Sequence, residues 1–152
     1  MRAFGSPGIS ARDPVAATTS DGTRLNRIPA VLWGSNEDTR LLLRGLLRLH
    51  QCPNVYEVAN LDDLEALPPL FAPTVLIVDA ENPEGPWDRD LAAALAARPE
   101  LRGLVVLPRD SAPLESRARA AGAAEVIRRP FAIQDFAQAV ATTAAAGATT
   151  GP

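Results

Sequence analysis

The strongest indication of the fold of this 152-residue chain is the segment Ala72-Pro73-Thr74-Val75-Leu76-Ile77-Val78-Asp79. Its central run, TVLIV, is apolar on both faces and rich in β-branched residues, which is typical of a parallel strand covered by helices on both sides. A proline precedes the run and an aspartate follows it. The segment therefore predicts a buried strand that ends in a carboxylate.

Apolar runs and helical patterns alternate on both sides of this strand. We expect further strands at 28–33, 54–58, 103–107 and 125–127, and helices at 36–49, 60–67, 88–98, 111–121 and from 132 onward. Five successive β-α units predict a three-layer α/β domain, with helices on both faces of a five-stranded parallel sheet. Ligands of such sheets bind at the carboxyl ends of the strands. The candidate site residues are therefore those that follow a strand: Gly34, Ser35, Asp79, Pro108, Arg109, Arg129 and Pro130.

The two ends of the chain lack the hydrophobic patterns of the middle. Residues 1–27 are mostly small, polar or turn-forming and show no period of 2 or 3.6, so we expect a disordered N-terminal tail. We expect the folded domain at 28–141 and a flexible C-terminal tail at 142–152. The sequence has neither a signal-peptide core nor an apolar stretch long enough to span a membrane, and we expect a cytoplasmic protein.

The composition excludes several classes of function. The formal net charge is −3 and the sequence pI is about 5.1, so we expect no general affinity for nucleic acid or for an anionic membrane. All 15 cationic residues are arginines, which excludes Schiff-base lysine chemistry and a P-loop lysine. One histidine, His50, and one cysteine, Cys52, leave no internal disulfide and no His-rich metal site.

The first predicted helix, at 36–49, is amphipathic. We expect Ser35 or Asn36 to cap it and Arg40, Arg44 and Arg48 to form a solvated stripe. Its predicted apolar side consists of Leu42, Leu43, Leu46, Leu47 and Leu49. Of the two tryptophans, we expect Trp33 in the core, while Trp87 is the better candidate for contact with a partner protein.

Three further motifs lie around the central strand at matching spacing. Asn82-Pro83-Glu84-Gly85 follows it, Gly34-Ser35-Asn36-Glu37-Asp38-Thr39-Arg40 follows the first strand, and residues 122–131 read GAAEVIRRPF. Together these motifs resemble the receiver (CheY-like) domains of bacterial response regulators, the phosphoacceptor domains of two-component signalling. The resemblance covers residues 28–141. It implies a flavodoxin-like, doubly wound (βα)5 fold, with Asp79 at the phosphoacceptor position and a cis Arg129–Pro130 peptide.

The pocket residues depart from that family. Its acidic pair falls on Gly34 and Ser35, its hydroxyl residue on Pro108 and its lysine on Arg129. Three carboxylates and a lysine attract Mg²⁺, whereas one aspartate and one arginine cancel. We therefore interpret the chain as a degenerate pseudo-receiver: a non-enzymatic signalling module without a cofactor that acts through protein–protein interaction.

Two alternatives stay open. In the first, Asp79 is a working phosphoacceptor that uses Mg²⁺, with Glu37 or Glu81 as substitute metal ligands. In the second, the vacated pocket senses a small ligand or anion through Arg129 and Arg109. The resemblance also implies a partner protein, such as a histidine kinase, and a homodimer formed through the last two helices, near 112–121 and 133–140.

Overall fold

The computed structural model describes residues 24–34, 36–70 and 73–149. Within them, five parallel strands form one sheet in the order β3-β2-β4-β5-β6. The strands are β2 (Ala30–Trp33), β3 (Val55–Val58), β4 (Thr74–Asp79), β5 (Leu101–Leu107) and β6 (Ala123–Arg128). The helices are α1 (Glu37–Leu49), α2 (Leu61–Glu65), α3 (Trp87–Ala97), α4 (Ala112–Ala120) and α5 (Ile133–Thr149). The predicted three-layer α/β architecture is confirmed.

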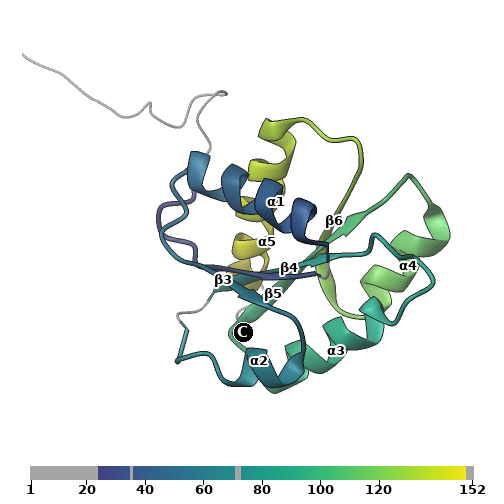
Figure 1. Cartoon of the computed structure of the whole chain (residues 1–152), viewed down its shortest axis with the longest axis horizontal. Coiled ribbons are helices and arrows are strands. Elements are labelled where there is room, and N and C mark those ends of the chain that lie inside the picture. The colour runs from purple at the N-terminus through teal and green to yellow at the C-terminus, as the bar shows by residue number, and fades with distance from the viewer. Residues whose placement is uncertain (1–23, 35, 71–72, 150–152) are drawn as a thin grey trace, which may run out of the picture.

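Helices cover both faces of the sheet, with α1 and α5 on one face and α2, α3 and α4 on the other (Figure 1). The central strand β4 contributes to both cores because alternate side chains point to opposite faces. Val75 and Ile77 pack under α1 and α5, whereas Leu76 and Val78 pack under the other three helices. This two-sided burial is the reason that the run TVLIV is continuously apolar.

Side-chain caps start three of the helices where the sequence places a capping residue. Asn36 accepts a hydrogen bond from the Thr39 backbone N–H at 3.0 Å and thereby caps α1. Asn60 and Ser111 cap α2 and α4 in the same way. Ser35, the alternative cap for α1, lies outside the described residues.

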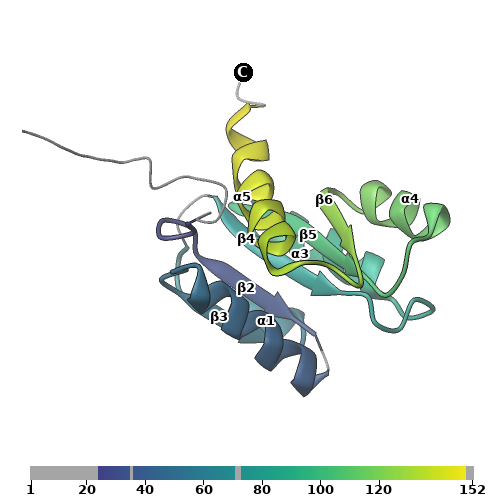
Figure 2. The same cartoon turned by 90° about the horizontal axis from the view of Figure 1, so that it is seen from above.

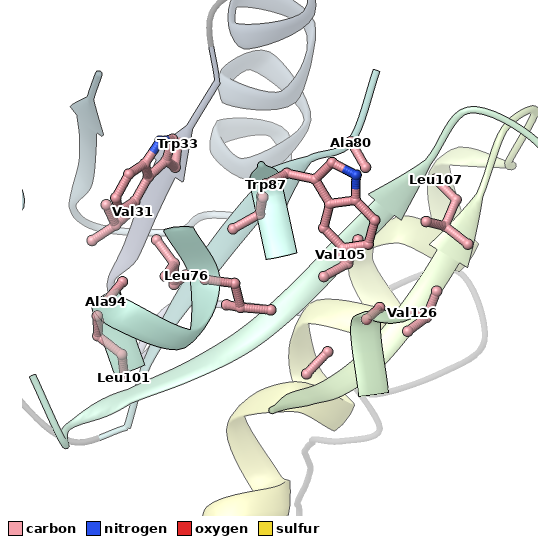
Figure 3. Close-up of a cluster of buried hydrophobic side chains, with 14 of the residues drawn as sticks. Val31, Trp33, Leu76, Ala80, Trp87, Ala94, Leu101, Val105, Leu107 and Val126 are labelled. Atoms are coloured by element: carbon pink, nitrogen blue, oxygen red, sulfur yellow. The ribbon is translucent and has the colours of Figure 1, made fainter. Parts of the chain in front are cut away.

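The two tryptophans share one core (Figure 3). Trp33 is buried as predicted. The prediction that Trp87 contacts a partner is wrong, because its side chain is only 6% exposed and packs in the same cluster. Its indole N–H donates to the Pro83 carbonyl at 3.3 Å, which satisfies the one polar group of the ring.

The predicted apolar side of α1 is partly wrong. Leu43, Leu46 and Leu47 are buried against the sheet, but Leu42 is 53% exposed and Leu49 is 64% exposed. At 3.6 residues per turn, Leu42 and Leu49 lie about a quarter of a turn or more from the centre of the buried stripe. The helix therefore carries leucines on its solvent side as well as on its core side.

The packed part of the chain extends beyond both predicted boundaries. Leu25, placed in the predicted tail, is fully buried, and its N–H donates to the His50 carbonyl at 2.8 Å. Helix α5 continues to Thr149, with Thr143 and Ala144 buried, so the stretch from 142 to 149 is helix rather than tail. Residues 1–23 and 150–152 lie outside the described part, where the tails stay a prediction. No helix in the described part is long and apolar enough to cross a membrane.

Candidate functional site

Residues that follow four different strands meet at the carboxyl edge of the sheet. Trp33 of β2 pairs with Val78 of β4, which makes Gly34 and Asp79 neighbours. Asp79 of β4 pairs with Val106 of β5, and Leu107 of β5 pairs with Arg128 of β6. The sheet thereby brings Gly34, Asp79, Pro108 and Arg129 together, as the sequence predicts. Ser35, another of the candidates, lies outside the described residues.

An ion pair occupies the centre of this edge. Arg129 Nη1 donates to Asp79 Oδ1 at 3.0 Å, and the Asp79 side chain is only 5% exposed. The backbone N–H of Arg129 donates to the Leu107 carbonyl at 3.0 Å, which fixes the start of the arginine against β5. The second terminal nitrogen, Nη2, is buried without a hydrogen-bond partner. The Arg129–Pro130 peptide is cis, as the resemblance implies.

Burial dominates the electrostatics of the pair. It raises the pKa of the Asp79 carboxyl above its ordinary value of 3.8 and outweighs the hydrogen bond and the charge of Arg129, which both act to lower that pKa. The negative charge of Glu81 also raises it. The formal charges of Asp79 and Arg129 cancel, so the buried centre of the site carries no net formal charge.

The position beside Asp79 is filled by a glycine. A Cβ atom on Gly34 would lie 3.6 Å from the Asp79 Cβ, an ordinary van der Waals contact. A side chain at position 34 would thus stand directly against the aspartate, and none is present. On the next ladder, Pro108 supplies neither a hydroxyl group nor a backbone N–H.

The donor set does not fit a magnesium ion. Mg²⁺ is held by carboxylates and phosphate oxygens in near-octahedral geometry. Here the one buried carboxylate is committed to Arg129, and the Asn36 side-chain amide donates to Glu81 at 3.1 Å. Glu37 is exposed on the first turn of α1. Across the described residues, no group of three His, Cys, Asp or Glu side chains is arranged to hold a metal.

A pocket of about 220 Å³ lies beside Asp79. Its lining includes both tryptophans and three carboxylates, but neither Arg129 nor Arg109: Trp33, Gly34, Ala59, Val78, Asp79, Glu81, Asn82, Gly85, Pro86, Trp87 and Asp90. Arg109 is exposed. The two arginines that the sequence joined in an anion site are therefore not brought together in this pocket, and its walls are acidic.

One residue that the sequence did not single out secures the loop after β4. Arg117 of α4 donates to the Pro83 carbonyl at 2.7 Å and to the Gly85 carbonyl at 3.3 Å. It forms an ion pair with Asp88 at 3.1 Å, and its guanidinium lies 4.8 Å from the centre of the Trp87 ring. The tertiary fold alone reveals this contact, because Arg117 lies 34 residues from Pro83 in the chain.

His50 and Cys52 have structural roles. The ring Nδ1 of His50 lies 3.0 Å from the Leu46 carbonyl at the end of α1, as expected for a histidine near a helix C-terminus. The Cys52 thiol donates to the Ile28 carbonyl at 3.0 Å, and burial raises its pKa to about 11. Such a thiol is almost entirely protonated at neutral pH and is a weak nucleophile.

The chain is similar to known proteins in structure, but no similarity was found by sequence. No protein-family profile matches the chain, and no curated protein matches it in sequence. Solved structures do match. A putative pilus assembly-related protein from Burkholderia pseudomallei K96243 has a TM-score of 0.65 at 18% identity, over 80% of this chain and 92% of that one.

Two receiver domains match at similar levels. The beryllofluoride-activated NtrC4 receiver domain dimer has a TM-score of 0.62 at 19% identity, over 76% of this chain and 95% of that one. A CheY-like response regulator receiver domain protein from Methanospirillum hungatei JF-1 has a TM-score of 0.63 at 17% identity, over 82% of this chain and 99% of that one. The chain therefore has the flavodoxin-like fold of the CheY-like receiver domains.

Proposed function

We propose that this chain is a receiver-like signalling module that acts by binding a partner protein and does not use standard magnesium-dependent phosphorylation. In this proposal it is a cytoplasmic binding module rather than an enzyme, and its domain starts near residue 24 rather than at 28. The observation that carries the proposal is the buried Asp79–Arg129 pair with a glycine where a second carboxylate would stand.

Phosphoryl transfer to an aspartate requires positive charge at the transferred group and at the attacking oxygen. A divalent cation that bridges nucleophile and phosphoryl group lowers the barrier by several kcal/mol. The residues around Asp79 supply one guanidinium, which already binds the aspartate, and no second carboxylate to hold a metal. Pro108 offers no hydroxyl group to bind the product.

The similar structures support a role in protein assembly or signalling. One is described as a putative pilus assembly-related protein and another is a receiver domain dimer. We propose a protein partner for this chain as well, either a signalling protein such as a histidine kinase or a component of a larger assembly. By the receiver resemblance, we propose α4, β6 and α5 as the partner surface and the last two helices as the surface of a homodimer.

A small-ligand sensor is a second candidate, favoured by the pocket beside Asp79. Its three carboxylates and two indole rings suit a small cation and disfavour the anion that the sequence suggested. The same pocket gives a direct assay, because Trp33 and Trp87 both line it and their fluorescence reports a bound molecule.

Acetyl phosphate with Mg²⁺ tests the main proposal. We expect the intact mass of the wild-type chain to stay unchanged, while a receiver of known activity gains one phosphoryl group in the same reaction. A Mg²⁺ titration followed by tryptophan fluorescence should show no millimolar or tighter binding. Phosphorylation of wild-type Asp79 would contradict the proposal and support the phosphoacceptor alternative.

A gain-of-site variant provides the matched control. Gly34→Asp combined with Ser35→Asp restores two carboxylates, and the space at position 34 accepts a side chain against Asp79. We expect this variant to bind Mg²⁺ in the titration in which the wild type does not. Equal Mg²⁺ responses of the two proteins would show that the missing acidic pair is not what keeps the metal out.

A further inference from the structure

The pocket beside Asp79 has walls of two kinds. One kind is aromatic: Trp33 ends β2, Trp87 begins α3, and both indoles belong to the same core cluster (Figure 3). The other kind is acidic, with Glu81 and Asp90 beside Asp79. Figure 2 shows the arrows of β2 and β4 pointing the same way, toward the edge of the sheet where this pocket lies. Apolar and aromatic walls with a few polar groups are the usual lining of a ligand pocket.

The three carboxylates of the pocket are not equally neutralised. Asp79 is paired with Arg129 at 3.0 Å. Glu81 is exposed and accepts a hydrogen bond from the neutral side-chain amide of Asn36. Asp90 is half-buried. In the part of the chain that the structure describes, neither Glu81 nor Asp90 forms an ion pair, so two negative charges of the pocket have no cation beside them.

One indole of the pocket already contacts a cation in this fold. The guanidinium of Arg117 lies 4.8 Å from the centre of the Trp87 ring. That charge does not serve the pocket, because Arg117 is paired with Asp88 at 3.1 Å and is not part of the pocket lining. The indole N–H of Trp87 donates to the Pro83 carbonyl, which leaves the ring itself to contact a ligand. Indole rings beside uncompensated carboxylates attract cations.

The walls favour an organic cation over a metal ion. Mg²⁺ requires several oxygen ligands in near-octahedral geometry, and the described residues hold no group of three acidic or other ligating side chains arranged for a metal. The volume of about 220 Å³ gives room for a ligand of several heavy atoms rather than for a single ion. An alkylated ammonium ion surrounds its charge with apolar groups. It therefore loses less hydration than ammonium or a metal ion when it enters a pocket with indole walls.

We propose that this pocket binds a small alkylated ammonium ion. The charges of Asp90 and Glu81 attract the nitrogen, and its alkyl groups pack against Trp33 and Trp87. Asp79 contributes little net charge to the site, because Arg129 neutralises it. The inference rests on the small-ligand candidate described above and names the chemical class of its ligand. It involves no metal and no reaction at Asp79, so it does not depend on the main proposal.

A choline titration of the full chain, followed by tryptophan fluorescence, tests the site. The chain has two tryptophans and both line the pocket, so any change in their emission reports on its surroundings. With sodium chloride keeping the ionic strength constant, we expect a saturable response in the millimolar range or tighter. The uncharged carbon isostere of choline has the same shape and should bind at least tenfold more weakly. Ammonium chloride should also bind at least tenfold more weakly, because ammonium is more strongly hydrated.

Substitution of the two uncompensated carboxylates should weaken binding. We expect Asp90→Asn to reduce the affinity for choline at least fivefold, and Glu81→Gln to reduce it at least threefold, since solvent screens the exposed Glu81 more. Glu84→Gln is the matched control. It removes one negative charge from the same loop, at an exposed position that does not line the pocket, and should leave the affinity unchanged.

Circular dichroism and urea denaturation should show that the three variants are folded. Glu81 and Glu84 are both exposed, so their comparison tests the site even if Asp90→Asn destabilises α3. Equal losses of affinity in Glu81→Gln and Glu84→Gln would overturn the inference, because they would show a general attraction of cations to an acidic surface.

The remaining outcomes separate this inference from the proposals on which it builds. Equal affinity for choline and its uncharged isostere would overturn the ammonium site and leave a pocket for neutral ligands. No saturable response to choline would also overturn it, and if acetyl phosphate still leaves the mass of the chain unchanged, the main proposal stands. Phosphorylation of Asp79 in a chain that binds choline as expected would contradict the main proposal and support the ammonium site.

Discussion

Two aspartate–arginine pairs, one at the end of strand β4 and one at the start of α3, have nearly equal closest N–O distances and opposite pKa shifts. Asp79 pairs with Arg129 at 3.0 Å, and Asp88 pairs with Arg117 at 3.1 Å. The Asp79 side chain is 5% exposed and burial raises its pKa. The Asp88 side chain is 27% exposed, and the hydrogen bond from Arg117 lowers its pKa.

The difference shows that burial of the carboxyl, rather than the presence of an arginine, decides whether its pKa is raised or lowered. A hydrogen bond and a positive charge lower the pKa of both carboxyls, but only the buried one loses enough hydration to reverse the effect. The ionised form of Asp79 is therefore disfavoured by burial even beside Arg129. The Asp88–Arg117 pair, in contrast, stabilises a surface loop. The substitutions below separate these two roles, beginning with the largest effect.

Removing the arginine of the buried pair should have the largest effect. Arg129→Met leaves the Asp79 carboxylate buried without a partner, and we expect a loss of about 2–4 kcal/mol in the free energy of unfolding at pH 7. Urea denaturation measures it. Part of the loss should be recovered as the pH is lowered, because burial raises the pKa of Asp79 and its protonation removes the unpaired charge. A loss below about 1 kcal/mol would show that water reaches the carboxylate freely.

Replacing the aspartate should cost less than replacing the arginine. Asp79→Asn keeps an acceptor oxygen for Arg129 and removes the buried negative charge, so we expect a change in stability of at most about 1–2 kcal/mol. Partner binding should persist, as a pull-down from the native cell measures. Loss of partner binding with an unchanged fold would mean that the charge of Asp79 carries the signal.

The same variant tests the sign of the pH dependence. Because the folded-state pKa of Asp79 is above 3.8, the favourable contribution of this group is complete below that pH. It is lost as pH rises through the folded-state pKa. Asp79→Asn should therefore flatten the wild-type decline in unfolding free energy just above pH 3.8, measured by denaturation at a series of pH values.

Removing the arginine of the exposed pair should act locally. Arg117→Ala frees the carbonyls of Pro83 and Gly85, and we expect faster amide hydrogen exchange in the loop at 82–86 without loss of the sheet. Arg119→Ala, at an exposed position two residues further along α4, is the matched control and should leave that loop unchanged. Equal exchange in both variants would deny the anchoring role of Arg117.

The smallest effect should come from Asp88→Asn. A partly exposed ion pair contributes little, so we expect a change of about 0.5 kcal/mol or less at neutral pH. The pKa of Asp88 lies below 3.8, and its contribution is present above that value and lost as pH falls through the folded-state pKa. The variant should therefore lose less stability than the wild type upon acidification below pH 3.8.

Strand positions were predictable because each depends on local pattern. The run at 74–78 is buried on both faces, so its apolarity is continuous and visible in the sequence. The cap residues Asn36, Asn60 and Ser111 act on backbone groups three positions away and are visible for the same reason. The candidate residues Gly34, Asp79, Pro108 and Arg129 followed from the strand ends, since parallel strands place these ends at one edge.

Contacts between distant residues were not predictable in the same way. Trp87 precedes a helix and looks like a surface residue until α4 brings Arg117 over its ring. The leucines of α1 form an almost continuous run in the sequence, and only the packing against the sheet separates the core side from the exposed side. The extent of α5 was underestimated because its Ala- and Thr-rich end has little amphipathic pattern, although Thr143 and Ala144 are buried.

The layered α/β architecture and the set of residues at the carboxyl edge of the sheet could be predicted from the sequence, because both follow from local hydrophobic pattern and strand order. The tertiary structure decided that Asp79 is buried against Arg129, that a pocket with acidic walls lies beside it, and that α1 presents leucines to solvent. The physical reason is that burial and charge pairing depend on neighbours from other elements, and a linear pattern does not specify how those elements pack.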